Sequence, residues 1–371
     1  MKKVLVVTTS DDMIWHFLLM HIKQLQDLGF EVECACSKTG FFFDEIAKVT
    51  GCKMHCVDFP RKPYSFKVFK AQKTLKKIVK NANFSLIYCH QPVGGVLARL
   101  VGHKYKVPVL YMAHGFHFYK GAPFLNNILY KTIEKYCSRF TEAIITTNLE
   151  DFEASKKLRA KKQYLINGPG LDLSKFQRQD CSDLKKELGI KKNDVVVLSI
   201  GELNKNKNHR IVIETIKQLN MPNVKYLICG RGPRDEEYKN LIEELNLCDQ
   251  VKLLGYRKDI PKILSLTDIY VMPSFREGLG MACLEAMCFK IPCIVSNIRG
   301  LNSLVEDNKN GFLIDPNNPD QLKEKLEILL KDNNLCKTFG EQSLNVVQKF
   351  SNENVSMQLE KIYKEIGLLN E

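Results

Sequence analysis

The sequence has no long hydrophobic run, because none of its apolar stretches approaches the ~18 consecutive residues of a membrane-spanning helix. The N-terminus, MKKVLVVTTSDDM, has too short an apolar stretch for a secretory signal. Low-complexity tracts are absent too, and 44% of the 371 residues are hydrophobic while 26% are charged. These features argue against an integral membrane protein and a disordered chain, and they predict a soluble, cytoplasmic, globular protein.

No pair among the 13 cysteines has the CxxC spacing, and their number is odd. Zinc sites and disulfide frameworks both fit this pattern poorly. We therefore expect free thiols, most of them buried as small hydrophobic side chains.

Acidic residues are scarce in the first half of the chain. Residues 1–180 hold 28 Lys and Arg but 15 Asp and Glu, a net charge of +13, whereas residues 181–371 hold 27 of each kind. A basic half beside a neutral half indicates that one domain faces an anionic partner such as a phospholipid surface, a pyrophosphate or a nucleic acid.

Apolar, β-branched runs alternate with segments of helical periodicity in the first half of the chain. Nearly continuous apolar strands separated by helices predict a parallel sheet covered on both faces. The expected strands are residues 4–8, 32–36, 86–89, 107–112 and 143–147, and the expected helices are residues 14–28, 66–81, 94–103 and 124–140.

The second half repeats this α/β pattern. Its expected strands are residues 195–200, 225–229, 251–254, 269–272 and 292–296, and its expected helices are residues 209–219, 235–247, 261–266 and 281–289. The turn-rich segment INGPGLDLSKF marks the join. We expect domains at 1–180 and 181–350 and a last helix, 351–371, that packs back on the first domain.

Two Rossmann-like domains commonly hold a ligand in the cleft between them, at the carboxyl ends of the strands. The first strand, however, leads into TTSDDM, where a G-x-G-x-x-G fingerprint would have glycines. The sequence therefore argues against a nicotinamide or flavin dinucleotide.

The segment PSFREGLGMACLEAM places two carboxylates on either side of a strand-to-helix turn. Glu277 lies in the turn, Glu285 lies in the helix, and both are expected to face one pocket. The backbone amides of Leu279, Gly280 and Met281 lie at the helix N-terminus, where phosphate or sugar oxygens bind well. The alternative is a pair of solvated acids that flank a helix start.

Three further loops follow expected strands. SIGELNKNKNH contains Gly201 and Lys207, CGRGPRDEE contains Gly230 and Gly232, and LLGYRKDI follows the next strand. In this order the motifs resemble those of the family-four glycosyltransferases, retaining sugar transferases with two facing Rossmann-like domains (the GT-B architecture). The resemblance spans essentially the whole chain and is strongest over about residues 195–316.

The resemblance implies a role for each of these positions. Glu277 would bind donor-sugar hydroxyls, Glu285 would bind the nucleotide ribose, and Lys207 would lie against the donor pyrophosphate. Backbone groups from Gly255 to Arg257 would line the base. The implied donor-binding residues are Gly201, Gly230, Gly232, Tyr256, Arg257, Gly278, Leu279, Gly280, Met281 and Glu285. Neither a metal nor a cofactor is implied.

One position departs from the family pattern. Relatives often have an arginine directly after the first-motif glycine, whereas this sequence has Glu202. A carboxylate beside a pyrophosphate would repel it, so Glu202 must point elsewhere, and Arg231 or Arg276 could substitute for the missing cation.

In the first domain, YMAHGFHFYKG places His114 and His117 after an expected strand. Similar enzymes have a histidine there that contacts the donor sugar near the reacting carbon, and we assign that role to His114. Acceptor contacts are expected from Ser10, His16, His90 and His117.

Two expected helices could lie on an anionic membrane. The first, FKVFKAQKTLKKIVKNANF, is rich in lysine, and the second, APFLNNILYKTIEKYCSRF, is rich in apolar residues. Alternatively, each covers the sheet and exposes its lysines to water. Similar enzymes often extend capsule or exopolysaccharide units on a polyprenyl pyrophosphate, an anionic and membrane-bound acceptor. Peripheral attachment to the inner face of the cell membrane would follow.

The reaction that the resemblance implies is transfer of a hexose or N-acetylhexosamine from a nucleotide diphosphate sugar, with UDP expected, to a glycan acceptor. A sugar-nucleotide epimerase or hydrolase of the same architecture is the first alternative. A non-catalytic nucleic-acid-binding protein is a remote one, because the lysine-rich helix offers Phe66 and Phe69 but no stacking platform. We expect no nucleic-acid partner.

Overall fold

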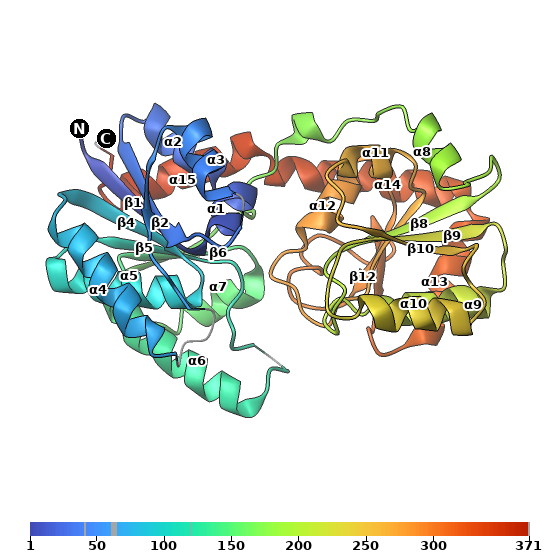
Figure 1. Ribbon diagram of the computed structural model, residues 1–371, viewed down its shortest axis with the longest axis horizontal. Coiled ribbons are helices and arrows are strands. Elements are labelled where there is room, and N and C mark those ends of the chain that lie inside the picture. Colours follow the sequence, from blue (N-terminus) through green and yellow to red (C-terminus); the bar gives the residue numbers. More distant parts are fainter. Residues whose placement is uncertain (41, 61–64, 120, 370–371) are drawn as a thin grey trace. The chain divides into compact units, whose positions relative to one another are not determined.

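The computed structural model describes residues 1–40, 42–60, 65–119 and 121–369, which form two compact units (Figure 1). The first unit contains Met1–Leu171 and the segment from Asn352 onward, and the second contains Asp172–Ser351. The first boundary in the structure therefore lies between Leu171 and Asp172, whereas the sequence analysis places it after residue 180. Residues 178 and 179 belong to the second unit because Arg178 donates to the carbonyl of Phe289 (3.4 Å) and the amide of Gln179 donates to Ser265 (2.8 Å).

A parallel seven-stranded sheet forms the centre of the first unit, in the order β3-β2-β1-β4-β5-β6-β7. Its strands are β1 (Lys3–Ser10), β2 (Glu31–Ser37), β3 (Lys53–Cys56), β4 (Phe84–His90), β5 (Val109–Ala113), β6 (Ala143–Thr146) and β7 (Lys162–Leu165). Alternate residues of β1 contribute to two cores: Val4 and Val6 pack on one face, and Leu5 and Val7 on the other. Both faces of the sheet are therefore covered.

Helices on the two faces of this sheet bury those cores (Figure 1). The helices are α1 (Asp11–Phe17), α2 (Leu19–Asp27), α3 (Phe42–Thr50), α4 (Lys67–Lys80), α5 (Pro92–Tyr105), α6 (Phe124–Cys137), α7 (Leu149–Ser155) and α15 (Asn352–Glu365), with a 3-10 turn at Ser138–Phe140. The C-terminal helix α15 buries Val355, Leu359 and Ile362 in the same core as Val4. The chain therefore returns to its first unit, as expected.

The second unit has a parallel six-stranded sheet in the order β10-β9-β8-β11-β12-β13. The strands are β8 (Val195–Ile200), β9 (Val224–Cys229), β10 (Val251–Gly255), β11 (Ile269–Met272), β12 (Cys293–Ser296) and β13 (Gly311–Ile314). The helices are α8 (Ser182–Glu187), α9 (His209–Leu219), α10 (Asp235–Glu244), α11 (Ile260–Ser265), α12 (Met281–Cys288), α13 (Pro319–Lys331) and α14 (Asn333–Val347), with 3-10 turns at Leu173–Lys175 and Gln348–Phe350. Both sheets thus have a doubly wound, Rossmann-like strand order.

The α/β class and the two Rossmann-like sheets confirm the expected architecture. Three strands, β3, β7 and β13, were not predicted. They have four residues each and lie at sheet edges, where β3 and β7 are at most half-buried and so lack a continuous apolar run. The expected helix 14–28 is divided into α1 and α2 at Leu18.

All 13 cysteines are free thiols, and eight of them are buried. Among the described residues, no helix combines the length and the apolar character needed to cross a bilayer.

Candidate functional site

The strand order of the second sheet reverses between β8 and β11, since the chain proceeds from β8 to β9 on one side and β11 lies on the other. In doubly wound sheets, ligands bind outside the carboxyl ends of the strands at such a switch point. The loop after β8 contains Gly201 and Lys207, and the loop after β11 contains Glu277. The fold thereby places both sequence-predicted side chains at the switch point.

Lys207 and Glu277 form an ion pair, with 2.7 Å between Nζ and Oε1. Their side chains are 21% and 13% exposed, so the pair is largely shielded yet open to a ligand. The stem of Lys207 crosses Gly201: a Cβ added at that glycine would lie 2.9 Å from Lys207 Cε. Gly201 is therefore needed to let the lysine reach the carboxylate.

Two asparagines hold the loop that carries Lys207. The side chain of Asn204 accepts a hydrogen bond from the Lys207 amide (3.0 Å). The backbone carbonyl of Asn206 accepts a hydrogen bond from the Phe275 amide (2.8 Å). The side chain of Asn206 donates one to the Arg276 carbonyl (2.9 Å). These bonds join the loops after β8 and β11. The sequence analysis did not assign them, although NKNKNH carries asparagines whose side chains can replace backbone partners.

Glu202 is exposed and accepts a hydrogen bond from the side chain of Asn204 (2.8 Å). Its carboxylate is thus held against its own loop. Arg231 and Arg276 are exposed, and neither has an ion-pair partner among the described residues. Their guanidinium groups are available to an anionic ligand.

Glycines allow the loops after β8, β9 and β10 to approach closely. A Cβ at Gly230 would lie 1.8 Å from the Gly201 carbonyl oxygen, and one at Gly232 would lie 2.4 Å from that of Leu203. The amide of Gly230 donates to the Gly255 carbonyl (2.8 Å). Next to them, Tyr256 is 55% exposed, whereas Arg257 forms a two-pronged ion pair with Asp259 (2.8 and 2.6 Å). The Arg257 guanidinium is therefore already held by a carboxylate.

Helix α12 begins directly after Gly280, which has a left-handed φ of +84°. A Cβ at Gly280 would lie 2.4 Å from Leu301 Cδ2, so a larger residue would not fit. Leu279 is buried in the core, while Gly278 and Met281 are half-buried. This turn leaves backbone groups, rather than side chains, at the start of the helix.

Glu285 lies in α12 and is half-buried. Burial raises the pKa of its carboxyl group to about 7. It has no hydrogen-bond or ion-pair partner among the described residues. Burial is the main cause that raises the pKa of the nearby Tyr270 hydroxyl, and two cysteines add to it. The charges of Glu285 and Glu277 raise that pKa further. Both acids therefore act on this one buried phenol.

The first sheet also has a switch point, between β1 and β4. Ser10 ends β1 there, and the following Asp11 is buried. Burial alone would raise the pKa of Asp11, but hydrogen bonds from Thr39 and Gly40 outweigh it and lower the pKa. That carboxylate is therefore occupied in joining the loops after β1 and β2.

His90 ends β4, His114 directly follows the neighbouring strand β5, and the two rings form a hydrogen bond, Nδ1 to Nε2, of 3.1 Å. Burial lowers the pKa of His114 to about 3 and holds that of His90 well below its usual range. Both rings are therefore neutral near pH 7, and each carries one N–H. One ring donates to the other, so the tautomers of His90 and His114 depend on each other.

The other candidates of the first unit lie apart from this pair. His16 is exposed on α1, and its ring centroid lies 5.3 Å from that of Phe42 in an edge-on arrangement. His117 contacts Tyr130 of α6, at 5.0 Å between ring centroids. The structure thus brings His90 and His114 together, whereas His16 contacts Phe42 of α3 and His117 contacts Tyr130 of α6.

Two family models match the chain. The model described as "Glycosyl transferases group 1" matches residues 180–346, and the one described as "Glycosyl transferase 4-like" matches residues 3–148. Each falls mainly within one structural unit.

Two curated relatives are similar over nearly the full length. EpsD of Bacillus subtilis (strain 168) is 31% identical, with 98% of this chain and 96% of the relative covered. The UDP-Gal:alpha-D-GlcNAc-diphosphoundecaprenol alpha-1,3-galactosyltransferase of Escherichia coli is 30% identical, with 93% of this chain and 90% of the relative covered.

Solved structures share the fold. HepE from Anabaena, in complex with UDP and glucose, has a TM-score of 0.81 at 21% identity and covers 98% of this chain and all of its own. The sucrose-phosphate synthase of Thermosynechococcus elongatus has a TM-score of 0.81 at 18% identity, with 99% of both chains covered.

Proposed function

The chain belongs to the group 1 glycosyltransferases, and from that premise we propose that it moves a hexose or N-acetylhexosamine from a UDP-sugar to a saccharide on a polyprenyl diphosphate, with retention of configuration. The transfer would extend a repeat unit of a capsule or exopolysaccharide. The observation that carries the proposal is the shielded Lys207–Glu277 ion pair at the switch point of the second sheet.

The donor diphosphate is assigned to Lys207 and the glycine-lined loops. An ammonium group has three N–H donors, so Lys207 can keep its bond to Glu277 and still donate to phosphate oxygens. Arg231 and Arg276 supply further positive charge where Glu202 replaces the usual arginine. With these cations and the amides at the start of α12, the diphosphate is stabilised without a divalent metal ion.

The donor sugar and the ribose are assigned to the two acids. Glu277 accepts from sugar hydroxyls with the oxygen that Lys207 leaves available. Glu285 is unpartnered among the described residues and partly withdrawn from water, and a carboxylate in that setting gains from two vicinal ribose hydroxyls. Backbone groups of Gly255, Tyr256 and Arg257 line the base. His114 contacts the transferred sugar as a neutral group, held in one tautomer by His90.

The proposed acceptor rests on the similarity to the Escherichia coli relative and on the positive charge of residues 1–180. The name of the Escherichia coli relative describes transfer to a sugar on diphosphoundecaprenol, and that relative is 30% identical. The +13 charge of residues 1–180 suits a diphosphate on an anionic membrane. The first unit is accordingly the acceptor-binding domain, the second is the nucleotide-sugar-binding domain, and the protein attaches peripherally to the inner face of the cell membrane.

The proposed reaction needs no side-chain base, because the departing diphosphate takes the acceptor proton. The bond between the anomeric carbon and the diphosphate oxygen breaks as the acceptor oxygen bonds to the same face of that carbon. The acceptor hydroxyl proton passes to the departing diphosphate, and Lys207 offsets the charge that develops there.

Product analysis tests this proposal against an epimerase or hydrolase of the same architecture. The protein is incubated with a UDP-sugar labelled in the sugar, with and without a polyprenyl-diphosphate saccharide. We expect label in the lipid-linked fraction and UDP in equal amount. Labelled free sugar or an altered nucleotide sugar, formed equally without acceptor, would assign the alternative.

A further inference from the structure

An apolar groove lies on the first unit between α4, α5 and α6, with a volume of about 440 Å³. Its lining includes Val68 of α4, Val96 and Leu100 of α5, and Tyr130 and Ile133 of α6. Its size is that of a small-molecule pocket. It lies on α4 and α6, outside the residues assigned to donor binding.

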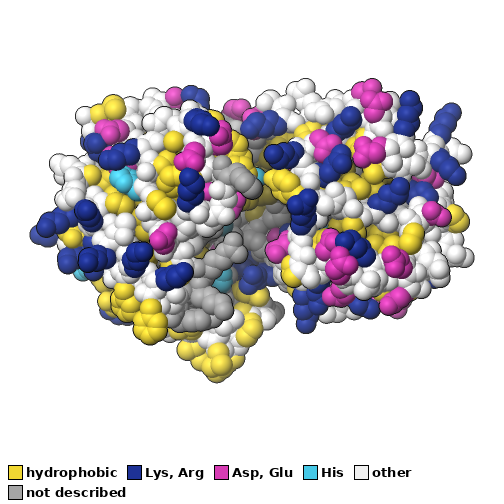
Figure 2. Space-filling view, viewed as in Figure 1, with side chains coloured by type: hydrophobic (Ala, Val, Ile, Leu, Met, Phe, Trp, Pro, Cys, Tyr) yellow, Lys and Arg dark blue, Asp and Glu magenta, His cyan; other side chains and the backbone are white. Residues whose placement is uncertain are grey.

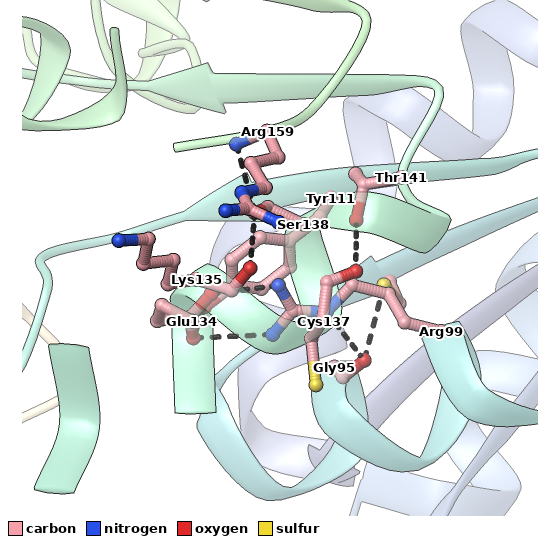
Figure 3. Close-up of polar contacts among 10 residues, drawn as sticks. Gly95, Arg99, Tyr111, Glu134, Lys135, Cys137, Ser138, Thr141 and Arg159 are labelled. Atoms are coloured by element: carbon pink, nitrogen blue, oxygen red, sulfur yellow. Dashed lines mark hydrogen bonds and ion pairs between the residues drawn. The ribbon is translucent and has the colours of Figure 1, made fainter. Parts of the chain in front are cut away.

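The groove offers no uncompensated charge. Glu134 is the one carboxylate among its described lining residues, and it accepts two hydrogen bonds from Arg99, at 2.6 and 3.1 Å (Figure 3). The Arg99 guanidinium carbon also lies 4.1 Å from the centroid of the Tyr111 ring. Arg99 is on α5 and Glu134 is on α6, so this buried pair fixes the two helices against each other. The groove is therefore pre-formed and suited to an uncharged, apolar ligand.

Exposed apolar side chains lie at the start of α4 and of α6, two of the helices that line the groove. Phe66 and Phe69, at the start of α4, are 89% and 70% exposed, and Phe124 and Leu125 of α6 are 76% and 77% exposed. Figure 2 shows apolar side chains gathered over the lower ends of α4 and α6, with Lys and Arg along the edge of the same unit. An exposed apolar patch of this kind marks an interaction surface.

A row of lysines accompanies this patch. Helix α4 carries Lys67, Lys70, Lys73, Lys76, Lys77 and Lys80, and Lys76 is the one that is half-buried rather than exposed. A ligand that fits both features has an apolar chain and an anionic end. A second copy of this chain fits less well, because it would bring another lysine-rich α4 to the same surface.

We propose that this groove binds the isoprenoid chain of the lipid-linked acceptor, while the lysines of α4 attract its diphosphate and the anionic head groups around it. The inference rests on the proposed function, which supplies an acceptor with such a chain. Transfer of the chain from water into the groove removes apolar surface from water on both sides. The groove would thereby select acceptors by their lipid rather than by their sugar.

The test is direct binding of an isoprenyl diphosphate. A photoreactive analogue of farnesyl diphosphate is crosslinked to the full chain, and the modified residues are identified by mass spectrometry. Unlabelled farnesyl diphosphate and inorganic diphosphate serve as competitors. We expect crosslinks on the groove residues of α5 and α6, and we expect farnesyl diphosphate to compete at least about tenfold better than inorganic diphosphate.

Two substitutions of half-buried lining residues introduce a larger side chain into the groove, Val96→Trp and Leu100→Trp. Each is expected to weaken binding at least about tenfold. Leu149→Trp, at an exposed apolar position of α7 outside the groove, is the matched control and is expected to bind like the wild type. UDP binding and the thermal unfolding temperature show whether each variant is folded, and the wild-type crosslinks test the proposal even if a variant is not.

Crosslinks confined to other surfaces, or equal competition by the two diphosphates, would overturn the inference. A wild-type dimer that Val96→Trp converts to a monomer would also overturn it, because the groove would then be a contact between two copies of the chain. Failure of the proposed function is a separate result: it is the absence of sugar transfer to any lipid-linked acceptor, whether or not farnesyl diphosphate lies in the groove. Equal transfer to a lipid-linked acceptor by wild type and Val96→Trp would reject the groove alone.

Discussion

Lys207 Nζ lies 2.7 Å from Glu277 Oε1, although 70 positions separate the two residues in the chain. The pair exists because β8 and β11 are neighbours in the sheet and because Gly201 lets the lysine stem cross the end of β8. Each of the two side chains therefore holds the other in place.

Alanine substitution of either residue tests the role of this pair. Lys207→Ala and Glu277→Ala should each lower transfer from a radiolabelled UDP-sugar at least about tenfold, or ~1.4 kcal/mol, because a charged contact to the donor is lost. The double variant should lose much less than the product of the single losses, since each substitution already breaks the pair.

Arg210→Ala with Glu214→Ala is the matched control. These residues form an exposed ion pair at 2.8 Å on α9, and their removal should leave transfer unchanged. Near-normal turnover in either single variant of the Lys207–Glu277 pair would contradict the assignment.

Glu285 should make stability depend on pH. Burial raises its pKa from 4.5 to about 7, so between these values the unfolded chain loses this proton while the folded protein keeps it. The contribution of Glu285 to stability is therefore fully present below about pH 4.5, falls as the pH rises to about 7, and is constant above. Relative to Glu285→Gln, the wild type should lose unfolding free energy across this window, measured by denaturant titration. A difference that does not vary with pH would show that the carboxyl pKa is ordinary.

Gly230 is required by the close approach of two loops. Gly230→Ala should destabilise the second unit by about 2 kcal/mol or more, because its Cβ would lie 1.8 Å from the Gly201 carbonyl oxygen, and it should also weaken UDP binding. Gly189→Ala is the control: its φ is +66°, with nothing within 4 Å of the added Cβ, so it reports backbone strain of ~1 kcal/mol alone. Equal unfolding free energies for the two variants would disprove the proposed clash.

Removing one member of the Arg99–Glu134 pair should destabilise the protein strongly, whereas replacing both members by apolar residues should destabilise it little. Arg99→Met leaves a buried carboxylate without its partner and should lower the unfolding free energy by about 3–5 kcal/mol. Adding Glu134→Leu should recover most of that loss, as measured by urea unfolding. A double variant as unstable as Arg99→Met would show that the cost comes from packing rather than from charge.

The lysines of α4 should govern membrane binding. Attachment to vesicles should require anionic lipid and weaken with added salt, because the attraction is screened over ~10 Å at 0.1 M ionic strength. Replacing Lys70, Lys73 and Lys77 by Glu should abolish it, measured by co-sedimentation, whereas replacing Lys185, Lys186 and Lys191 in the second unit should not. Equal binding to neutral vesicles at high salt would exclude the electrostatic attachment.

The two Rossmann-like sheets could be predicted because their central strands are continuous apolar runs, such as Val195–Ile200, each followed by a helical pattern. The short edge strand Lys53–Cys56 could not, since it alternates partly exposed polar and apolar residues. The glycine loops and the acids of the second unit could be singled out as candidates because their types and spacings are local features of the sequence.

Contacts that depend on tertiary structure were not predictable from those local features. The pairing of Lys207 with Glu277, the link from His90 to His114 and the buried Arg99–Glu134 pair each join residues from different elements. Sequence identified Arg99 neither as buried nor as paired, because an arginine on a helix is usually solvated. Only the fold shows that its guanidinium group contacts Glu134 of α6 and the ring of Tyr111.

Transfer of label from a UDP-sugar to a polyprenyl-diphosphate saccharide, in the presence of a metal chelator, tests the central claim most directly. We expect the wild type to form an α-linked, lipid-bound product from an α-configured donor, and Glu277→Ala to form at least about tenfold less. A β-linked product, a requirement for divalent metal, or equal product from Glu277→Ala would contradict it.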